Sequence, residues 1–169
     1  MNRRAFTLVE MLIVIAIIAT LTGIGIPVAR SMIASSREAA CLGNLRSLGV
    51  GMESYLQENQ RKLPTLVVSR SSKSDSSPAL ETVLLPYIES TEAFRCPADS
   101  EDFEKTGSSY AWNFLLNDKL MSDLSLLGIE DRLERIPLIL DKQSRHPNGT
   151  NFLYADLSSS NKDRFAAGN

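Results

Sequence analysis

The chain has 169 residues, of which 43% are hydrophobic and 22% are charged, and its formal net charge is −2. Its lysines and arginines are scattered and form no basic stripe, which argues against a nucleic-acid-binding protein. The sequence contains no Gly-rich phosphate-binding loop and no internal repeat. Beyond residue 59 about 110 residues remain, enough for one modest globular domain.

An apolar run lies almost at the N-terminus, directly after Arg3 and Arg4. Between Phe6 and Val28, Glu10 is the only ionisable side chain. A run of this length spans the ~30 Å hydrocarbon layer of a membrane as a helix. The basic pair before it predicts a cytoplasmic N-terminus and an exported remainder. A carboxylate in such a run costs about 2.5–3.5 kcal/mol at mid-membrane, so Glu10 indicates a partner or a task.

The start of this run reads Arg-Arg-Ala-Phe-Thr-Leu-Val-Glu-Met-Leu-Ile-Val-Ile-Ala-Ile-Ile, residues 3–18. It resembles the class III signal of type IV pilins and type II secretion pseudopilins. In that family a prepilin peptidase removes a short basic leader before a Phe, which is then N-methylated. The resemblance implies cleavage between Ala5 and Phe6, although the family nearly always has Gly where this chain has Ala5. Pro27 falls where the family often has a helix-kinking proline.

Two other interpretations of the run are a cleaved secretory signal and a plain membrane anchor. A secretory signal has a short apolar core, whereas this run is longer and would place Glu10 near the start of the core. A plain anchor needs neither Glu10 nor the Phe-Thr-Leu-Val-Glu order. The pilin-type signal therefore explains the run best.

Glu10 has a specific role in the pilin-type interpretation. After cleavage, Phe6 carries a free or methylated amine that stays basic. In a staggered stack of such helices, Glu10 of one subunit can meet the amine of its neighbour, so that two charges unfavourable in an apolar bundle are neutralised. The pair is expected to fix axial register more than to add stability, and the resemblance implies the same assembly role.

Helical character continues beyond the apolar run. Gly23, Gly25 and Pro27 weaken the helix near its exit from the membrane. From Arg30 the pattern is amphipathic, and the helix is expected to end near Asn59, about 80 Å from its start at ~1.5 Å per residue. The expected apolar stripe is Leu42, Leu45, Leu48, Met52 and Tyr55, with Arg37, Glu38, Arg46, Glu53 and Gln57 mainly off it.

These features predict four parts: a leader over 1–5, a transmembrane and filament-core helix over 6–28, its amphipathic continuation over 29–59, and a periplasmic globular head over 60–169. In the head we expect a flexible polar loop over 69–78 and a short helix or turn over Leu80–Ile88, limited by Pro86. Residues 99–109 look irregular, and Leu115–Leu127 looks like helix and loop. Two strands, 136–141 and 151–156, flank turn chemistry at 146–150.

A second resemblance covers the head. Its motifs occur in the order Cys41-x-x-Asn44-Leu45, Phe94-Arg95-Cys96-Pro97, Ser109-Tyr110-Ala111-Trp112-Asn113 and His146-x9-Asp156. They resemble the pilin-related proteins of planctomycete and verrucomicrobial bacteria that carry a His-x9-Asp-Gly element. Here Leu157 follows Asp156, so the element is incomplete. The resemblance supports lineage and fold, and it carries over no chemistry.

The two cysteines, Cys41 and Cys96, both fall in the exported part. In an oxidising compartment an even count favours one disulfide. It would close a loop of about 55 residues, worth roughly 4 kcal/mol in the chain-entropy model. The alternative is two buried free thiols.

His146, Asp141 and Asp156 form the one constellation that suggests metal binding or acid–base chemistry. Asp141 and His146 flank the turn, so they could approach each other. One histidine with scattered carboxylates is weak evidence for zinc, and the spacing matches no calcium loop. No Gly-x-Ser-x-Gly element supports a hydrolase. A structural role in the hairpin is favoured, and we predict no catalytic residue, cofactor or metal.

The sequence therefore predicts an α+β, pilin-like fold with a long N-terminal helix packed on a small antiparallel sheet. The expected function is a structural, non-enzymatic subunit of a type II secretion pseudopilus or type IV pilus-like filament. Its expected partners are the prepilin peptidase, other pilin subunits, the inner-membrane assembly platform and the membrane. The alternative is a membrane-anchored periplasmic binding or enzymatic domain that does not assemble.

Overall fold

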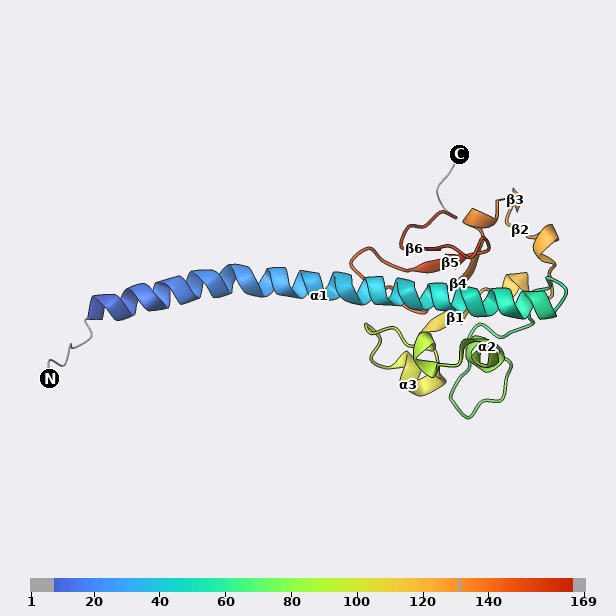
Figure 1. The fold of residues 1–169 in the computed structure, drawn as a ribbon, viewed down its shortest axis with the longest axis horizontal. Helices are drawn as coiled ribbons and strands as arrows, with labels where there is room; N and C mark the ends of the chain where they lie inside the picture. Colours follow the sequence, from blue (N-terminus) through green and yellow to red (C-terminus); the bar gives the residue numbers. More distant parts are fainter. Residues whose placement is uncertain (1–7, 131, 166–169) are drawn as a thin grey trace.

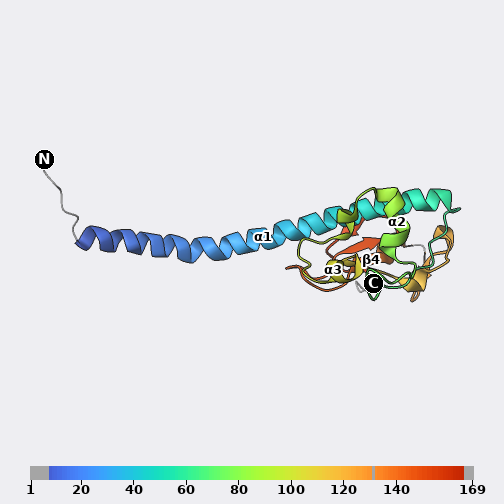
Figure 2. The same cartoon turned by 90° about the horizontal axis from the view of Figure 1, so that it is seen from below.

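The computed structural model describes residues 8–130 and 132–165. A long N-terminal helix, α1 (Leu8–Glu58), projects far beyond a small head (Figure 1). The head lies against one side of the C-terminal half of α1 (Figure 2). With its small antiparallel sheet, this is the α+β pilin-like layout expected from the sequence.

The two halves of α1 differ in burial. Residues 8–33 are all exposed in the single chain, and this half contains a stretch long and apolar enough to cross a membrane, by length and composition. Burial begins at Glu38 and recurs to the end of the helix, at Glu38, Cys41, Leu45, Leu48, Gly49, Gly51, Met52 and Leu56. The second half of α1 therefore belongs to the head, whereas the first half makes no core within the described chain.

The buried stripe of α1 is shifted from the expected one. Leu42 and Tyr55 are only half-buried, whereas Cys41 and Leu56 are fully buried and complete the stripe. The expectation that Glu38 lies off the stripe is wrong. Glu38 precedes Cys41 by three residues, which is same-face spacing in a helix, and its exposed fraction is 4%.

The helix runs through Pro27 without interruption and ends at Glu58, next to the expected end at Asn59. Pro27 has no N–H to donate to the carbonyl of Gly23, so one bond of the helix ladder is missing there. The ribbon of α1 is bowed rather than straight in both views (Figures 1 and 2).

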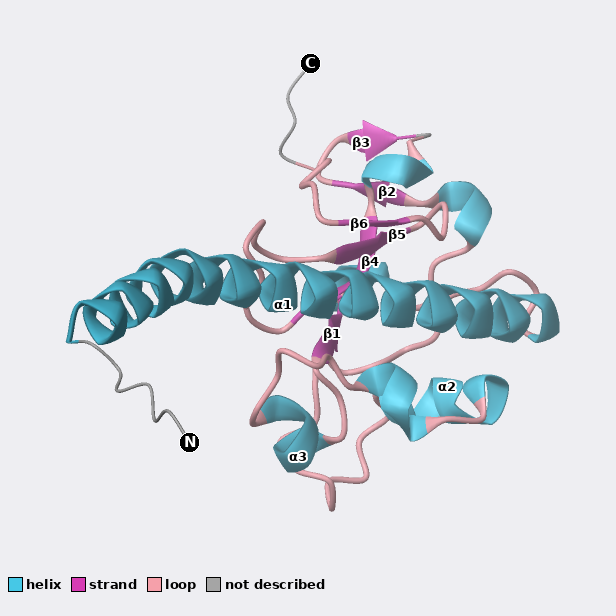
Figure 3. Cartoon of the chain, turned by 60° about the vertical axis from the view of Figure 1, so that its left-hand side comes forward, coloured by secondary structure: helices cyan, strands magenta, loops and turns pink. Residues whose placement is uncertain are grey.

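A four-stranded antiparallel sheet crosses beneath α1, in the order β1-β4-β5-β6 (Figure 3). Its strands are β1 (Tyr110–Trp112), β4 (Pro137–Asp141), β5 (Phe152–Tyr154) and β6 (Ser159–Ser160). The strands β4 and β5 lie within the two predicted runs and pair antiparallel, with Leu140 opposite Phe152. The predicted hairpin is thus present, and β1 adds to its other edge.

The remaining elements are short. The helix α2 (Leu80–Ile88) forms where a helix or turn was expected, and Pro86 lies in its last turn. The expectation of irregular structure over 99–109 is wrong in part, because α3 (Asp102–Thr106) lies there. A two-stranded hairpin pairs β2 (Ser125–Leu126) with β3 (Ile129–Glu130). Four 3₁₀ helices complete the described head: η1 (Thr91–Phe94), η2 (Phe114–Leu116), η3 (Met121–Asp123) and η4 (Leu133–Arg135).

The loop over 69–78 is irregular, as expected, but it is anchored rather than loosely attached. Arg70 Nε donates to Glu81 Oε1 at 2.6 Å, and both side chains are nearly buried. The same guanidinium also donates to the carbonyls of Lys73, Asp75 and Thr106. One buried cation therefore ties the loop to α2 and to the end of α3.

Candidate functional site

The predicted site residues fall in two regions. We call residues 8–33 of α1 the assembly segment, and the buried group Glu38, Cys41, Cys96, Asp141 and His146 the neck cluster. The predicted cleavage and methylation positions, Ala5 and Phe6, lie outside the described residues. Glu10 lies in the first turn of α1, on the exposed side of the chain. A carboxylate is favoured there because the first turn carries the positive end of the helix dipole.

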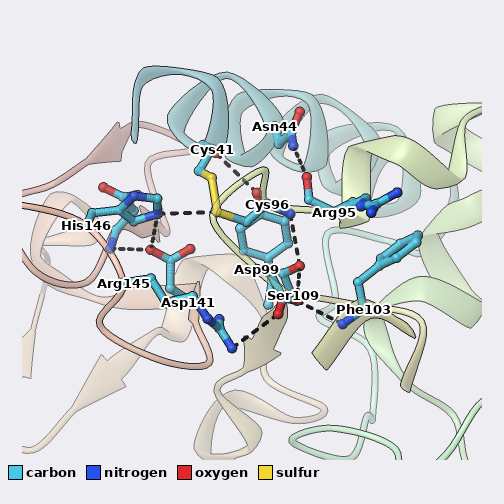
Figure 4. The surroundings of a disulfide bond; sticks show 12 residues. Cys41, Asn44, Arg95, Cys96, Asp99, Phe103, Ser109, Asp141, Arg145 and His146 are labelled. Atoms are coloured by element: carbon cyan, nitrogen blue, oxygen red, sulfur yellow. Dashed lines mark hydrogen bonds and ion pairs between the residues drawn. A yellow bond between two sulfur atoms is a disulfide. The ribbon is translucent and has the colours of Figure 1, made fainter. Parts of the chain in front are cut away.

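A disulfide joins Cys41 on α1 to Cys96 after η1, as the cysteine count favoured. Their Cα atoms are 5.0 Å apart, and the two residues are 0% and 2% exposed. Asn44, one turn further along α1, donates to the Arg95 carbonyl at 2.6 Å, beside the disulfide (Figure 4). A covalent bond and a hydrogen bond therefore fasten α1 to the same segment of the head.

His146 lies against this disulfide. Its Nε2 atom is 3.3 Å from Cys96 Sγ and 3.5 Å from Asp141 Oδ2 (Figure 4). Asp141 ends β4, and a tight turn returns the chain, because Gly149 at φ +96° donates its N–H to the His146 carbonyl at 3.0 Å. The predicted approach of Asp141 and His146 across the turn is confirmed.

Burial dominates the electrostatics of this pair. Burial raises the pKa of Asp141 to about 6, although the Asn151 N–H, 2.8 Å from Oδ2, works in the opposite direction. Burial also lowers the pKa of His146. Both shifts favour the uncharged forms, as expected for acid and base groups removed from water.

The structure does not bring Asp156 into this cluster. Its carboxylate accepts hydrogen bonds from the Ser158 N–H and hydroxyl, at 2.9 and 2.6 Å, and lies 4.0 Å from Arg164 Nη1. Asp156 therefore shapes the turn after β5. The expected constellation of His146, Asp141 and Asp156 is wrong, because β5 carries Asp156 to the far end of the hairpin.

Sequence reasoning missed the part played by Glu38. Both of its carboxylate oxygens accept from Asn148 Nδ2, at 3.1 and 3.0 Å, and Oε1 also accepts from Asn161 Nδ2 at 3.0 Å. The signal available in the sequence was the position of Glu38, at helical spacing from the apolar residues of the stripe. Such a position calls for buried hydrogen-bond donors from elsewhere in the chain.

Asp99 is a further buried carboxylate near the disulfide, besides Glu38 and Asp141, and it is structural. It accepts from the Ser109 hydroxyl and from three backbone N–H groups at the start of α3. Burial raises its pKa, but these hydrogen bonds outweigh burial and lower it to about 2. Arg145 adds an ion pair at 3.3 Å, so the carboxylate is fully partnered.

Comparison with family models matches residues 1–26 to the prokaryotic N-terminal methylation motif. No match was found among curated proteins or among solved structures. The matched residues end before the head, so the likeness of the head to the planctomycete and verrucomicrobial group stays a prediction. The chain thus carries the class III signal of type IV pilins and pseudopilins, and its N-terminal signal and its layout are those of a pilin-like precursor.

Proposed function

We propose that this chain is a structural subunit of a type II secretion pseudopilus or a type IV pilus-like filament. The observation that carries the proposal is the division of α1. The assembly segment is exposed throughout and mainly apolar, while one face of the same continuous helix is buried in the head from Glu38 onward. A helix built in this way presents a long apolar surface that the described part of the chain does not cover.

The precursor would reside in the inner membrane, with its N-terminus in the cytoplasm and its head in the periplasm. A prepilin peptidase would cut between Ala5 and Phe6 and methylate Phe6. The leader is then residues 1–5, and residues 6–28 become the filament core. In lipid the assembly segment needs no cover, because lipid tails are as apolar as the helix. Once the assembly platform extracts it, neighbouring subunits must cover it, because exposed apolar surface costs about 25 cal/mol per Å².

The neck cluster has a mechanical role in this function. Any force on the assembly segment reaches the head through α1, and the disulfide and Glu38 bind α1 at the first buried turns. The chain thus combines an exposed apolar helix surface before residue 34 with a helix that is bound to the head after it. The axial register between subunits would be set by pairing of Glu10 with the N-terminal amine of a neighbouring subunit. We propose no catalytic step.

The mature N-terminus tests the proposal. Intact-mass analysis of membrane-extracted protein should show loss of residues 1–5 and gain of one methyl group. The Ala5→Gly variant, which restores the family's usual residue, should be processed at least as fully. Retention of Met1 in cells with an active peptidase would instead support the alternative, a membrane-anchored periplasmic binding or enzymatic domain.

A further inference from the structure

Four metal-binding side chains converge in the neck cluster from separate parts of the chain. Cys41 comes from α1, Cys96 from the segment after η1, Asp141 from the end of β4 and His146 from the hairpin turn (Figure 4). The two Sγ atoms and one ring nitrogen of His146 lie within 4.8 Å of one another. Asp141 Oδ2 adds an oxygen 3.5 Å from His146 Nε2. We propose that these four residues form a Zn²⁺ site in the chain before its disulfide has formed.

The donor set and its spacing fit zinc. Tetrahedral zinc has Zn–S distances near 2.3 Å and Zn–N distances near 2.0–2.1 Å, which place neighbouring ligand atoms roughly 3–4 Å apart. Cys96 Sγ and His146 Nε2 are 3.3 Å apart, and the histidine–aspartate distance of 3.5 Å also falls in this range. In the reduced chain the two sulfur atoms are no longer bonded to each other, and in the proposed site they would separate to the same range. A mixed S₂NO donor set favours zinc over calcium or magnesium.

The hydrogen bonds of the described residues leave this cluster open. Asp141 Oδ1 and His146 Nδ1 are buried, and neither has a hydrogen-bond partner within the described part of the chain. Buried polar atoms are nearly always partnered, as the four-donor shell of Asp99 nearby illustrates. The carboxylate of Asp141 thus keeps unused lone pairs on Oδ1 that a metal ion would use, whereas Oδ2 accepts the Asn151 N–H. The ring nitrogen of His146 that faces the sulfur is Nε2, so Nδ1 would carry the proton of a metal-bound imidazole.

Binding involves no electron transfer. Each thiol loses a proton to solvent, two sulfur–metal bonds form, and the histidine and aspartate each donate a lone pair. Two thiolates and one carboxylate exceed the charge of the metal by one. Of the nearby charges that act on Asp141, Arg145 opposes this excess and Glu38 adds to it. Zinc binding and the disulfide exclude each other, because each of them requires both sulfur atoms. The newly exported chain, which still has its thiols, is the form that would bind zinc.

The test uses the full-length chain in detergent, with and without a phosphine reductant, and Co²⁺ as a spectroscopic substitute for zinc. The reduced protein should bind one Co²⁺ per chain, with thiolate-to-cobalt charge-transfer bands and strong tetrahedral visible bands, and Zn²⁺ should displace it. The disulfide-bonded protein should give none of these bands. His146→Gln should weaken Zn²⁺ affinity more than about 100-fold, since even outer-shell partners contribute 10–100-fold.

Asp141→Asn should weaken zinc binding at least about tenfold, whereas Asp156→Asn, at the other end of the hairpin, should leave it unchanged. Near-UV circular dichroism of the disulfide-bonded variants shows whether each one folds. The proposal is overturned if the reduced parent binds no Co²⁺, or if His146→Gln binds it with the same spectrum and affinity. It is also overturned if reduction abolishes the near-UV signal and added zinc does not restore it.

Discussion

Glu38 accepts hydrogen bonds from Asn148 on both of its carboxylate oxygens, at 3.1 and 3.0 Å. The two residues are 110 positions apart in the sequence. Asn161 donates to Oε1 as well, so one side chain of α1 holds both the turn after β4 and the segment after β6. Since Glu38 is the first buried residue of α1, the head is fixed to the helix where the assembly segment ends.

Glu38→Ala should therefore destabilise the head. The substitution removes the acceptor of the half-buried Asn161 amide and of the exposed Asn148 amide. A polar group left unpaired costs about 1–3 kcal/mol only where it stays buried. Urea unfolding of the detergent-solubilised chain should show a loss of about 1–3 kcal/mol, and Glu38→Gln, which keeps one acceptor oxygen, should lose less. The control is Glu53→Ala, whose partly exposed ion pair with Arg61 should contribute no more than about 1 kcal/mol. Equal losses for Glu38→Ala and Glu53→Ala would refute the assigned role of Glu38.

The disulfide should provide a large share of the stability of the head. Cys41 and Cys96 are 55 positions apart, and closing such a loop is worth about 4 kcal/mol in the chain-entropy model. In the presence of a chelator, reduction should lower the free energy of unfolding by about this amount. Alkylation without reductant should label neither cysteine. Labelling of both in protein taken directly from cells would show that the bond does not form there.

Gly51 is expected to tolerate no side chain, because α2 packs closely on α1 there. A Cβ atom at position 51 would lie 2.5 Å from Ile88 Cγ1 and 2.8 Å from Ile88 Cδ1. Gly51→Ala should destabilise the head by about 1–2 kcal/mol, the overpacking cost less the helix gain of alanine. Gly43 offers the matched control, since a Cβ there meets nothing within 4 Å. Gly43→Ala should stabilise by about 0.5–1 kcal/mol, and matching signs for the two would contradict close α1–α2 packing.

Asp141 should make stability fall as the pH rises. Its pKa is raised by burial from 3.8 to about 6, so between these values the folded chain binds more protons than the unfolded chain. Stability therefore decreases from pH 4 to pH 6, by at most about 3 kcal/mol for this group. Asp141→Asn stays uncharged, so its advantage over the parent should grow across that interval in urea unfolding. A constant difference would mean that Asp141 is ionised in the folded state throughout.

The sequence predicted best those features that depend on residue order and residue counts alone. The run after Arg4 is contiguous, so its apolar character and Glu10 could be read directly. Asp141 and His146 are separated by one turn, and their approach followed from the turn chemistry. The bond between Cys41 and Cys96 followed from the cysteine count and the expected compartment.

The contacts that sequence reasoning missed all depend on tertiary packing. The partners of Glu38 come from residues more than 100 positions away, and no local pattern connects them. The strand β1 has only three residues and lacks alternation, because all three are buried. The helix α3 is five residues long and begins on the Asp99 carboxylate, so neither periodicity nor length could reveal it.

Glu10 is expected to control assembly of the subunit into a filament. Glu10→Ala makes the membrane segment more apolar, so insertion and leader cleavage should persist. Filament incorporation should fail, because the neighbour's amine would be buried without its partner, at a cost of about 3–5 kcal/mol per subunit. Thr22→Ala is the control, since its hydroxyl donates to the Ile18 carbonyl of its own helix at 2.7 Å. The measurement is the amount of each variant in filaments sheared from cells, with the variant produced alone or together with the parent. Incorporation of Glu10→Ala at the level of Thr22→Ala would show that register is set by packing of the apolar surfaces instead.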